Sequence, residues 1–220
     1  MKERPILFSA PMVRAILAGT KTQTRRALRD QPCMLPYFNR GHLSIRVRGA
    51  VYQAFSPNFP PVRCPYGQPG DRLWVRETWL DLQGTGVEYR DRDGRLQRCA
   101  YGADTPPGSH GDEARKDYGL KWRPSIHMPR WANRITLEIT GVRVERLQDI
   151  SEADAISEGI ESAYESWRDY RTDPAVNFPC ADSPISSYQT LWESINGTGS
   201  WDANPWVWVL EFKRIERSAA

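Results

Sequence analysis

The sequence predicts an α+β fold in which a small β-barrel carries flanking short helices and long inserted loops. Three observations point to this class. Apolar residues alternate in several segments, most clearly in 134–147 and 206–215, and such alternation is typical of strands. The segments with helical periodicity are few and short. The 17 prolines and 16 glycines among 220 residues require long irregular connections between these elements.

One domain spanning residues 1–220 is the simplest expectation. An apolar content of 40% with nine tryptophans is typical of a globular chain that buries a core. The net charge of +3 argues against a protein that is basic throughout, so a nucleic-acid-binding surface would have to be a local patch. No apolar run approaches the length of a membrane span, and the N-terminus lacks the pattern of a secretory signal. We expect a cytoplasmic, monomeric protein with no membrane partner.

Cysteine usage indicates free thiols in a reducing compartment, because the four cysteines lie far apart without paired spacing. A metal site built from Cys33, His42, Cys64 and Cys99 is the alternative, but these separations match no ligand motif. We therefore expect neither a metal ion nor a cofactor.

The first predicted helix starts after Ser9, which can cap it, and ends before Gly19, which suits a left-handed C-terminal position. Four apolar residues recur between them at helical spacing. The helix thus leads directly into a polar segment, residues 19–26, with the sequence GTKTQTRR. Lys21 and Thr24 could form an activated nucleophile, a hydroxyl beside an amine base. The alternative is a solvated basic turn.

Two hairpins are predicted from alternating segments, one in 42–55 around Gly49 and one in 87–101 with Asp93-Gly94 at its tip. Residues 104–119 are polar and rich in glycine and proline, and they predict a mobile loop.

A strand is predicted between these hairpins, directly after the turn Pro69-Gly70-Asp71. Leu73 and Val75 share one face of it, and Glu77 follows them onto the same, inner face, whereas Arg76 lies on the other. An inward carboxylate requires a partner or a function, because burying an unpaired charge is costly.

Residues 121–131 interleave basic groups with aromatic rings in an irregular loop. The residues concerned are Lys121, Trp122, Arg123, Arg130 and Trp131. This composition is typical of a surface that stacks bases and neutralises phosphates. The alternative is that the two tryptophans cover edges of the core while the charges stay in water.

The C-terminal half predicts further elements. Residues 134–147 are interpreted as a strand pair with a bend or bulge at Gly141, and 206–215 as a strand in the middle of a sheet. Ser151 and Asp154 resemble a capping box for a short helix that Gly159 ends. Residues 161–170 are assigned a possible short helix, and 187–195 an amphipathic one.

Glu158 falls in the last turn of the helix that follows Ser151. The negative end of the helix dipole opposes a carboxylate there by ~0.3–1 kcal/mol. This placement is a modest indication of function, although exposed glutamates at helix ends are common.

Five segments in order carry a resemblance to a known family. They are the first helix with GTKTQTRR, the strand PGDRLWV, the run TLEIT at 136–140, the helix at 151–160 and the closing run VLEFK at 209–213. In these the chain resembles the ASCH family, the activating-signal-cointegrator homology domains of the PUA-like superfamily, and especially its larger bacterial and phage-borne members. Residues 28–66 and 84–120 look like insertions relative to compact members.

The resemblance implies a small β-barrel with a cleft and a role in binding RNA, nucleotides or modified nucleosides. One compact bacterial member is an amidohydrolase that deacetylates N4-acetylcytidine. Its lysine, threonine and glutamate correspond by motif to Lys21, Thr24 and Glu158, and its next arginine to Arg26. Glu77 has no counterpart in that enzyme, and we expect it to contact the substrate together with Arg76 and Arg26.

The resulting hypothesis is that Thr24 Oγ attacks an amide carbonyl while Lys21, its pKa lowered by partial burial and by Arg25 or Arg26, accepts the proton. Glu158 would orient the lysine or relay a proton to the leaving amine. Lys21 and Thr24 face opposite sides of a plain strand, so a turn or bulge must separate them. A salt bridge between Glu158 and Lys21 would instead keep the lysine protonated and favour the alternative, a non-catalytic module that binds RNA or a modified nucleotide.

Overall fold

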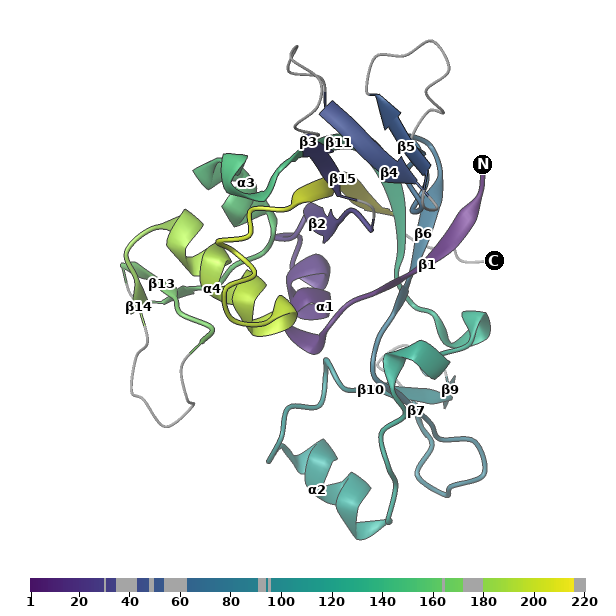
Figure 1. The fold of residues 1–220 in the computed structure, drawn as a ribbon. Coiled ribbons are helices and arrows are strands. Elements are labelled where there is room, and N and C mark those ends of the chain that lie inside the picture. Colours follow the sequence, from purple (N-terminus) through teal and green to yellow (C-terminus); the bar gives the residue numbers. More distant parts are fainter. Residues whose placement is uncertain are drawn as a thin grey trace.

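The structure is a computed structural model that describes residues 1–29, 31–34, 43–47, 50–53, 63–90, 94, 96–163, 165–171 and 180–215. Its core is a five-stranded sheet with the strand order β1-β6-β11-β15-β2 (Figure 1). The strands are β1 (Glu3–Leu7), β6 (Arg72–Arg76), β11 (Thr136–Arg146), β15 (Trp206–Ile215) and β2 (Gln23–Ala27). Neighbours are antiparallel except β1 and β6.

The predicted central position of β15 is confirmed, because it pairs with β11 on one side and β2 on the other. Leu210 and Phe212 pack into the hydrophobic core shared with the first helix, whereas Val207 and Val209 pack into a second core with the later helices. Burial on both faces explains why this strand is almost continuously apolar.

The segment predicted as a strand pair at 134–147 is one long strand, β11, and the prediction of a pair is wrong. The pairing register with β15 shifts between Ile139 and Gly141, so the predicted bulge is confirmed. A bulge bends a strand without reversing its direction, and the chain therefore continues along β15 after Gly141.

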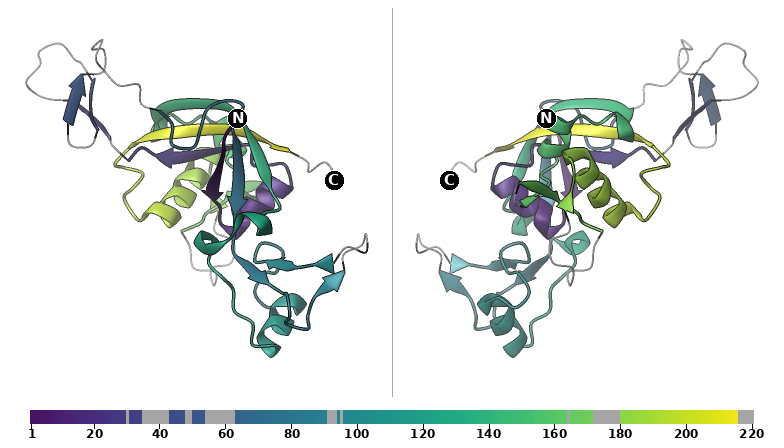
Figure 2. Two further views of the ribbon diagram at one scale, coloured as in Figure 1. Left: turned by 90° about the vertical axis from the view of Figure 1, so that its right-hand side faces the viewer. Right: turned by 90° about the vertical axis from the view of Figure 1, so that its left-hand side faces the viewer.

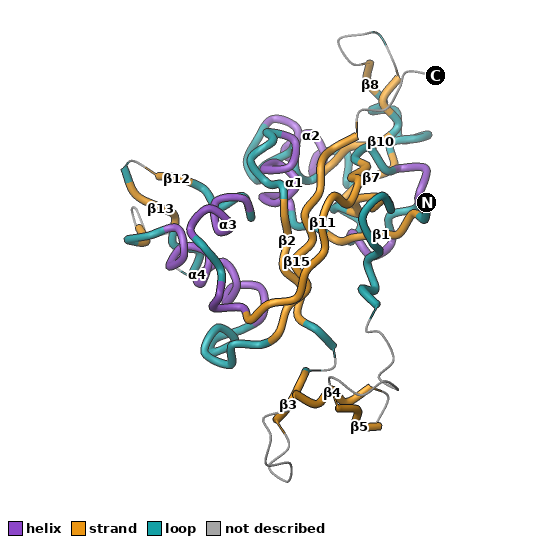
Figure 3. The backbone as a smooth tube through the Cα atoms, turned by 90° about the horizontal axis from the view of Figure 1, so that it is seen from above, coloured by secondary structure: helices purple, strands orange, loops and turns teal. Residues whose placement is uncertain are grey.

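Two groups of helices lie on this sheet. Helix α1 (Ala10–Leu17) buries Val13 and Ile16 in the first core. Helices α3 (Glu152–Ser157) and α4 (Pro184–Asn196) pack against each other in the second core. Figure 3 shows β2, β15 and β11 running side by side, with α3 and α4 together beyond β2.

The smaller elements form four further sheets. They are β3 (Pro32–Met34), β4 (Leu43–Val47) and β5 (Ala50–Gln53); β7 (Trp79–Asp81) with β10 (Cys99–Tyr101); β8 (Tyr89–Arg90) with β9 (Leu96–Gln97); and β12 (Ser162–Ala163), β13 (Ser166–Arg168) and β14 (Cys180–Ala181). Strands β3–β5 lie apart from the central sheet (Figure 3). Strands β7 and β10 project from its other end together with α2 (His110–Asp117) (Figure 2).

The two predicted hairpins are confirmed as β4–β5 and β8–β9. Gly94 adopts φ +76° at the second turn, whereas Gly49 and Asp93 lie outside the described residues. The helix predicted at 187–195 begins earlier, at Pro184, because Ser183 and Ser186 form a reciprocal capping box there.

Two other predictions are wrong. The segment 104–119, predicted as a loop, contains α2, since Ser109 caps its N-terminus and Asp112 pairs with Arg115 and Lys116 along the helix. The possible helix at 161–170 is replaced by β12 and β13. In that region Trp167 packs against the second core, so tertiary contacts decide the conformation.

The α+β class is confirmed, with most of the core built from sheet. In the described residues the central sheet is open, with β1 and β2 as its outer strands, and no closed barrel is present. None of the helices in the described part of the chain combines the length and apolarity needed to cross a membrane.

Candidate functional site

The segment that follows α1, residues 19–22, is hydrogen-bonded to the C-terminal end of α3. Gly19 turns the chain with φ +78°, and Ala15 O then accepts hydrogen bonds from the amides of Thr20 (2.9 Å) and Lys21 (3.1 Å). The amide of Thr22 donates to Ser157 O at 2.9 Å. Lys21 therefore lies outside β2, and Thr22 separates it from the strand. The turn at Gly19 precedes Lys21, so it is not the turn or bulge between Lys21 and Thr24 that the sequence hypothesis required.

Lys21 and Glu158 form a buried ion pair at this junction. Lys21 Nζ donates to Glu158 Oε2 at 2.8 Å and to the Glu158 backbone oxygen at 2.7 Å. Both residues are only 2% exposed. Burial lowers the pKa of Lys21, and the Glu158 carboxylate opposes this shift without cancelling it. The amine is therefore easier to deprotonate than an ordinary lysine.

Gly159 permits the close approach that this pair requires. It follows Glu158, which terminates α3, and it has φ +79°. A Cβ atom at this position would lie 2.8 Å from the Cβ atoms of both Ala15 and Lys21. Only glycine accommodates both the backbone conformation and the contact, so Gly159 sets the distance between Glu158 and Lys21.

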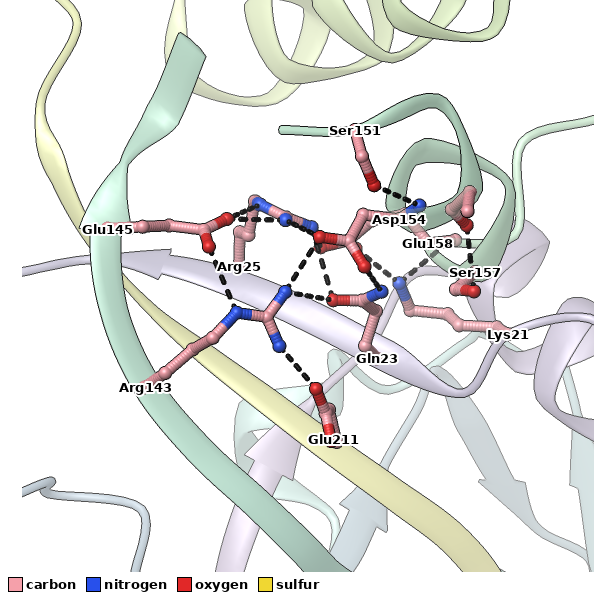
Figure 4. A network of polar contacts seen from close by, with 11 residues as sticks. Lys21, Gln23, Arg25, Arg143, Glu145, Ser151, Asp154, Ser157, Glu158 and Glu211 are labelled. Carbon is pink, nitrogen blue, oxygen red and sulfur yellow. Dashed lines mark hydrogen bonds and ion pairs between the residues drawn. The ribbon is translucent and has the colours of Figure 1, made fainter. Parts of the chain in front are cut away.

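Arg25 holds the other oxygen of Glu158. Its guanidinium is completely buried, and Nη1 donates to Glu158 Oε1 at 3.2 Å. Nη2 donates to Asp154 Oδ2 at 2.9 Å and to Glu145 Oε1 at 2.5 Å. Figure 4 shows this guanidinium between the carboxylates of the three acidic residues. The two oxygens of Glu158 are thus divided between Lys21 and Arg25.

An outer set of side chains surrounds Arg25 (Figure 4). Gln23 Nε2 donates to Asp154 Oδ1 at 2.7 Å, and Arg143 Nη2 donates to Asp154 Oδ2 at 2.7 Å. Arg143 also contacts Glu145 and Glu211. Partial burial alone would favour the neutral acid, but Gln23 and the two arginines hold the pKa of Asp154 below its ordinary value.

The sequence did not predict Gln23, Glu145 or Asp154 as members of the site, and it predicted Arg25 there only as one of two arginines that could lower the pKa of Lys21. Gln23 and Arg25 alternate with Thr24 along β2, so they share the face opposite to it. Asp154 and Glu158 are four residues apart on a short helical segment and therefore face the same way. The two-residue repeat of the strand and the four-residue spacing on the helix are the sequence signals that could have grouped these residues.

Thr24 lies on β2 opposite Leu210 and is 2% exposed. Its hydroxyl makes no hydrogen bond with any residue that the structure describes. Thr24, Arg26 and Glu158 line a cavity of about 60 Å³ that α4 covers with Tyr188 and Trp192. Lys21 does not line it, so Glu158 contacts Lys21 on one side and shares the cavity with Thr24 on the other.

Arg26 lines this cavity and has a buried donor without a partner. Its Nη2 donates to Leu7 O at 2.6 Å, and its guanidinium lies 5.3 Å from the centre of the Phe8 ring. Its Nε is buried without a hydrogen-bond partner among the described residues. A buried N–H without an acceptor is costly, and a ligand oxygen in the cavity would satisfy it.

Glu77 and Arg76, the other expected substrate contacts, lie elsewhere. Arg134 donates Nε and Nη2 to the two Glu77 oxygens, each at 2.9 Å. Burial raises the pKa of Glu77, although Arg134 opposes the shift. Arg76 donates to the backbone oxygens of Met128 and Ile126. Among the described residues neither contacts Lys21 or Glu158, and each has a structural partner.

The basic and aromatic residues of 121–131 differ in their surroundings. Trp131 is 49% exposed, packs edge-on against Trp79 at 5.6 Å and carries Arg98 over its ring at 4.4 Å. Arg130 pairs with Glu3 at 2.9 Å. Trp122 lines a second cavity of about 440 Å³, whereas Lys121 is exposed and the Arg123 guanidinium lies over the Trp79 ring.

Within the described residues, no group of three histidines, cysteines or acids has the geometry of a metal site. Cys64 packs against the first core and Cys99 belongs to a separate cluster around Trp79, so these two proposed ligands are apart. His42 lies outside the described residues.

Comparison of the chain with protein-family models, with curated proteins and with solved structures gives no match.

Proposed function

We propose that the protein is an amidohydrolase that removes an acyl group from the exocyclic amine of a cytidine-type nucleoside, free or within RNA. The observation that carries the proposal is the buried Lys21–Glu158 pair beside an unpaired Thr24 hydroxyl and an unpaired Arg26 N–H. Buried ion pairs are rarely more stabilising than apolar residues of the same size. Such a pair next to unpaired polar groups is typical of a site that keeps its polar groups for a ligand.

The reaction would begin when Thr24 Oγ adds to the amide carbonyl carbon. The hydroxyl proton passes through Glu158 to the neutral amine of Lys21, and Arg26 Nε donates to the oxygen that becomes negative. Collapse of this intermediate breaks the C–N bond, and the leaving amine takes the proton back. Water then hydrolyses the threonine ester to release a carboxylic acid. The lowered pKa of Lys21 supports this assignment, because a base must be unprotonated to act.

The cavity beside Thr24 is too small for a nucleoside in the conformation described. A volume of about 60 Å³ has room for only one or two water molecules. Its cover is the C-terminal half of α4, where Ile195 is 52% exposed. Binding therefore requires side chains of α4 to move away from Thr24, as in other enzymes whose sites close over the substrate.

The test is incubation with N4-acetylcytidine, with chromatography of the products. Wild-type protein should release cytidine and acetate, Thr24→Ala should be inactive, and Thr24→Ser should retain activity because it keeps the hydroxyl. Lys21→Arg is the matched control for charge, since arginine stays protonated and cannot accept the proton. Release of cytidine by Thr24→Ala at the wild-type rate would refute the mechanism.

A second candidate is a non-catalytic module that binds RNA or a modified nucleotide. The ion pair itself favours it, because two Lys21 hydrogen bonds to Glu158 stabilise the protonated amine. This candidate predicts salt-dependent binding of RNA without product release, and the same affinity for wild type and Thr24→Ala.

A further inference from the structure

Trp192 is a buried aromatic residue at the cavity beside Thr24. It lies on α4, beyond the strand β2 that carries Thr24 and Arg26 (Figure 3), and it is only 5% exposed. It lines the cavity of about 60 Å³. Its indole Nε1 is buried and has no hydrogen-bond partner among the described residues, and the same is true of Arg26 Nε. Two of the lining residues therefore each hold an N–H group without an acceptor.

An indole N–H is a donor only, and a buried one usually has an acceptor because the unpaired group loses its hydrogen bond to water. An oxygen atom with two lone pairs can accept from two donors at once. A ligand carbonyl oxygen in the cavity would thus satisfy both Trp192 Nε1 and Arg26 Nε.

We propose that Trp192 is a further catalytic residue, whose Nε1–H donates together with Arg26 Nε–H to the oxygen of the acyl carbonyl. The inference rests on the proposed function, since it assigns a second donor to the same reaction. As Thr24 Oγ bonds to the carbonyl carbon, the π electrons of the C=O bond move onto the oxygen. Both donors stabilise this charge without giving up a proton, and the electrons return to the carbonyl when the C–N bond breaks.

The position of Trp192, and not the unpaired N–H alone, distinguishes it from other tryptophans. Trp79 and Trp206 also have a buried indole N–H without a partner in the described part of the chain. Neither of them lines the cavity beside Thr24, and Trp79 packs in a separate cluster. Trp192 instead shares the cavity with the proposed nucleophile and with the other unpaired donor.

The Trp192 ring is held in place by packing. It belongs to the second core together with Val207 and Val209 of β15, and its centre lies 6.4 Å from that of the Tyr188 ring. The helix that carries it begins at the capping box of Ser183. A donor fixed in this way does not have to reorient when charge develops, which is the property that makes such donors effective in catalysis.

Other side chains of α4 can open the cavity while Trp192 stays in the core. Leu191 and Ile195 also line the cavity, and Ile195 is 52% exposed. Movement of exposed side chains costs less packing than movement of a core ring, so the ligand enters past Ile195 and meets Trp192 already in position.

The first test is the kinetics of Trp192→Phe, which removes the N–H and keeps an aromatic ring. The kcat for N4-acetylcytidine should fall about 10²- to 10³-fold, the usual effect of removing one oxyanion donor, while KM stays within roughly twofold. Trp79→Phe is the matched control, because it also removes a buried, unpartnered N–H, and its kcat should equal that of wild type. A Trp192→Phe variant as fast as wild type would overturn the inference and leave the hydrolysis intact.

A binding measurement covers the case in which Trp192→Phe does not fold. Thr24→Ala cannot form the ester, so it should bind N4-acetylcytidine without turnover. In ¹H–¹⁵N correlation spectra of this variant, the Trp192 indole resonance should shift when N4-acetylcytidine is added, whereas the Trp79 resonance should not. Cytidine is the matched control ligand, since it lacks the acyl oxygen and should leave the Trp192 resonance in place. An unshifted Trp192 resonance, or an equal shift with cytidine, would overturn the inference.

Failure of the proposed function has a different signature. If wild-type protein releases no cytidine but its Trp192 resonance shifts with N4-acetylcytidine and not with cytidine, the hydrolysis is refuted and the Trp192 contact with the acyl oxygen is supported. Release of cytidine together with an unshifted Trp192 resonance refutes the donor alone. Absence of both turnover and shift refutes both.

Discussion

Two buried glutamates in this protein, Glu77 and Glu158, have opposite surroundings. Arg134 satisfies both oxygens of Glu77 with a bidentate pair, and its side chain is 24% exposed, so the charges are partly solvated. The oxygens of Glu158 are divided between two cations, Lys21 and Arg25, whose side chains are fully buried. Glu158 also lines a cavity at which Arg26 Nε and Trp192 Nε1 have no hydrogen-bond partner among the described residues.

The difference shows how a structural carboxylate can be separated from a candidate functional one. Both are about equally buried, at 1% and 2% exposure, so burial alone does not distinguish them. The distinguishing property is whether the polar groups around the carboxylate are all paired. Both oxygens of Glu77 are paired with Arg134, and Arg134 pairs in turn with Asp104. The cavity that Glu158 lines is also lined by Thr24 and by Arg26, whose Nε has no hydrogen-bond partner among the described residues.

The largest expected effect separates the two glutamates by catalysis. Lys21→Met should lower the rate of N4-acetylcytidine hydrolysis by about 10²- to 10⁴-fold, the usual contribution of a general base. Glu77→Gln should leave that rate within about twofold, because a partner bond to Arg134 remains and no contact with the site is lost. Rates under saturating substrate measure both. If Glu77→Gln proves as inactive as Lys21→Met, the division into structural and functional glutamates is wrong.

A large effect on stability should distinguish the two arginines. Arg25→Met leaves Glu158, Asp154 and Glu145 without their shared partner and should lower the free energy of unfolding by about 3–5 kcal/mol. Arg134→Met should lower the free energy of unfolding by less. The pKa of Glu77 is raised, so this carboxyl can take up a proton more readily once its partner is lost. Urea unfolding at neutral pH measures both. A smaller loss for Arg25→Met than for Arg134→Met would contradict this ordering.

Gly159 tests the close approach between α3 and Lys21. Gly159→Ala should destabilise the protein by about 1–2 kcal/mol through its left-handed backbone, with a further loss because the new Cβ meets Lys21 and Ala15 at 2.8 Å. Gly19→Ala is the matched control: its φ is +78°, but no atom lies within 4 Å of the added Cβ. Thermal unfolding of both variants isolates the contact. Equal losses would show that the approach is not tight.

The smallest effect concerns acid stability. The pKa of Asp154 is lowered in the folded protein, so its stabilising contribution is complete above its ordinary value of about 3.8. As the pH falls below this value, Asp154 takes up its proton in the unfolded chain before it does so in the folded protein. Its contribution to stability therefore declines progressively and is gone once the pH lies below the folded-state pKa. Asp154→Asn should therefore flatten the decline in stability below about pH 4. An unchanged slope, measured by unfolding at several pH values, would exclude Asp154 as a contributor.

The sequence by itself determined the local elements of this protein. Helical spacing between Ser9 and Gly19 defined α1, and the apolar run at 206–215 defined the central strand β15. Both depend on contacts within a few residues, which periodicity and capping describe directly. Composition predicted a loop at 104–119, and this prediction was wrong. The glycines and prolines of the segment were given more weight than the ion pairs of Asp112 with Arg115 and Lys116, which stabilise α2.

Only the tertiary structure decided which polar groups meet. Lys21 and Glu158 are 137 residues apart in the chain, and Arg25 and Glu145 are 120 apart. The first pair is set by how α3 packs against the segment after α1, and the second by the sheet order β11-β15-β2, long-range arrangements that local patterns do not encode. The same reason explains why the cavity at Trp122 was not foreseen, since it exists only where α2 and the β7–β10 pair come together.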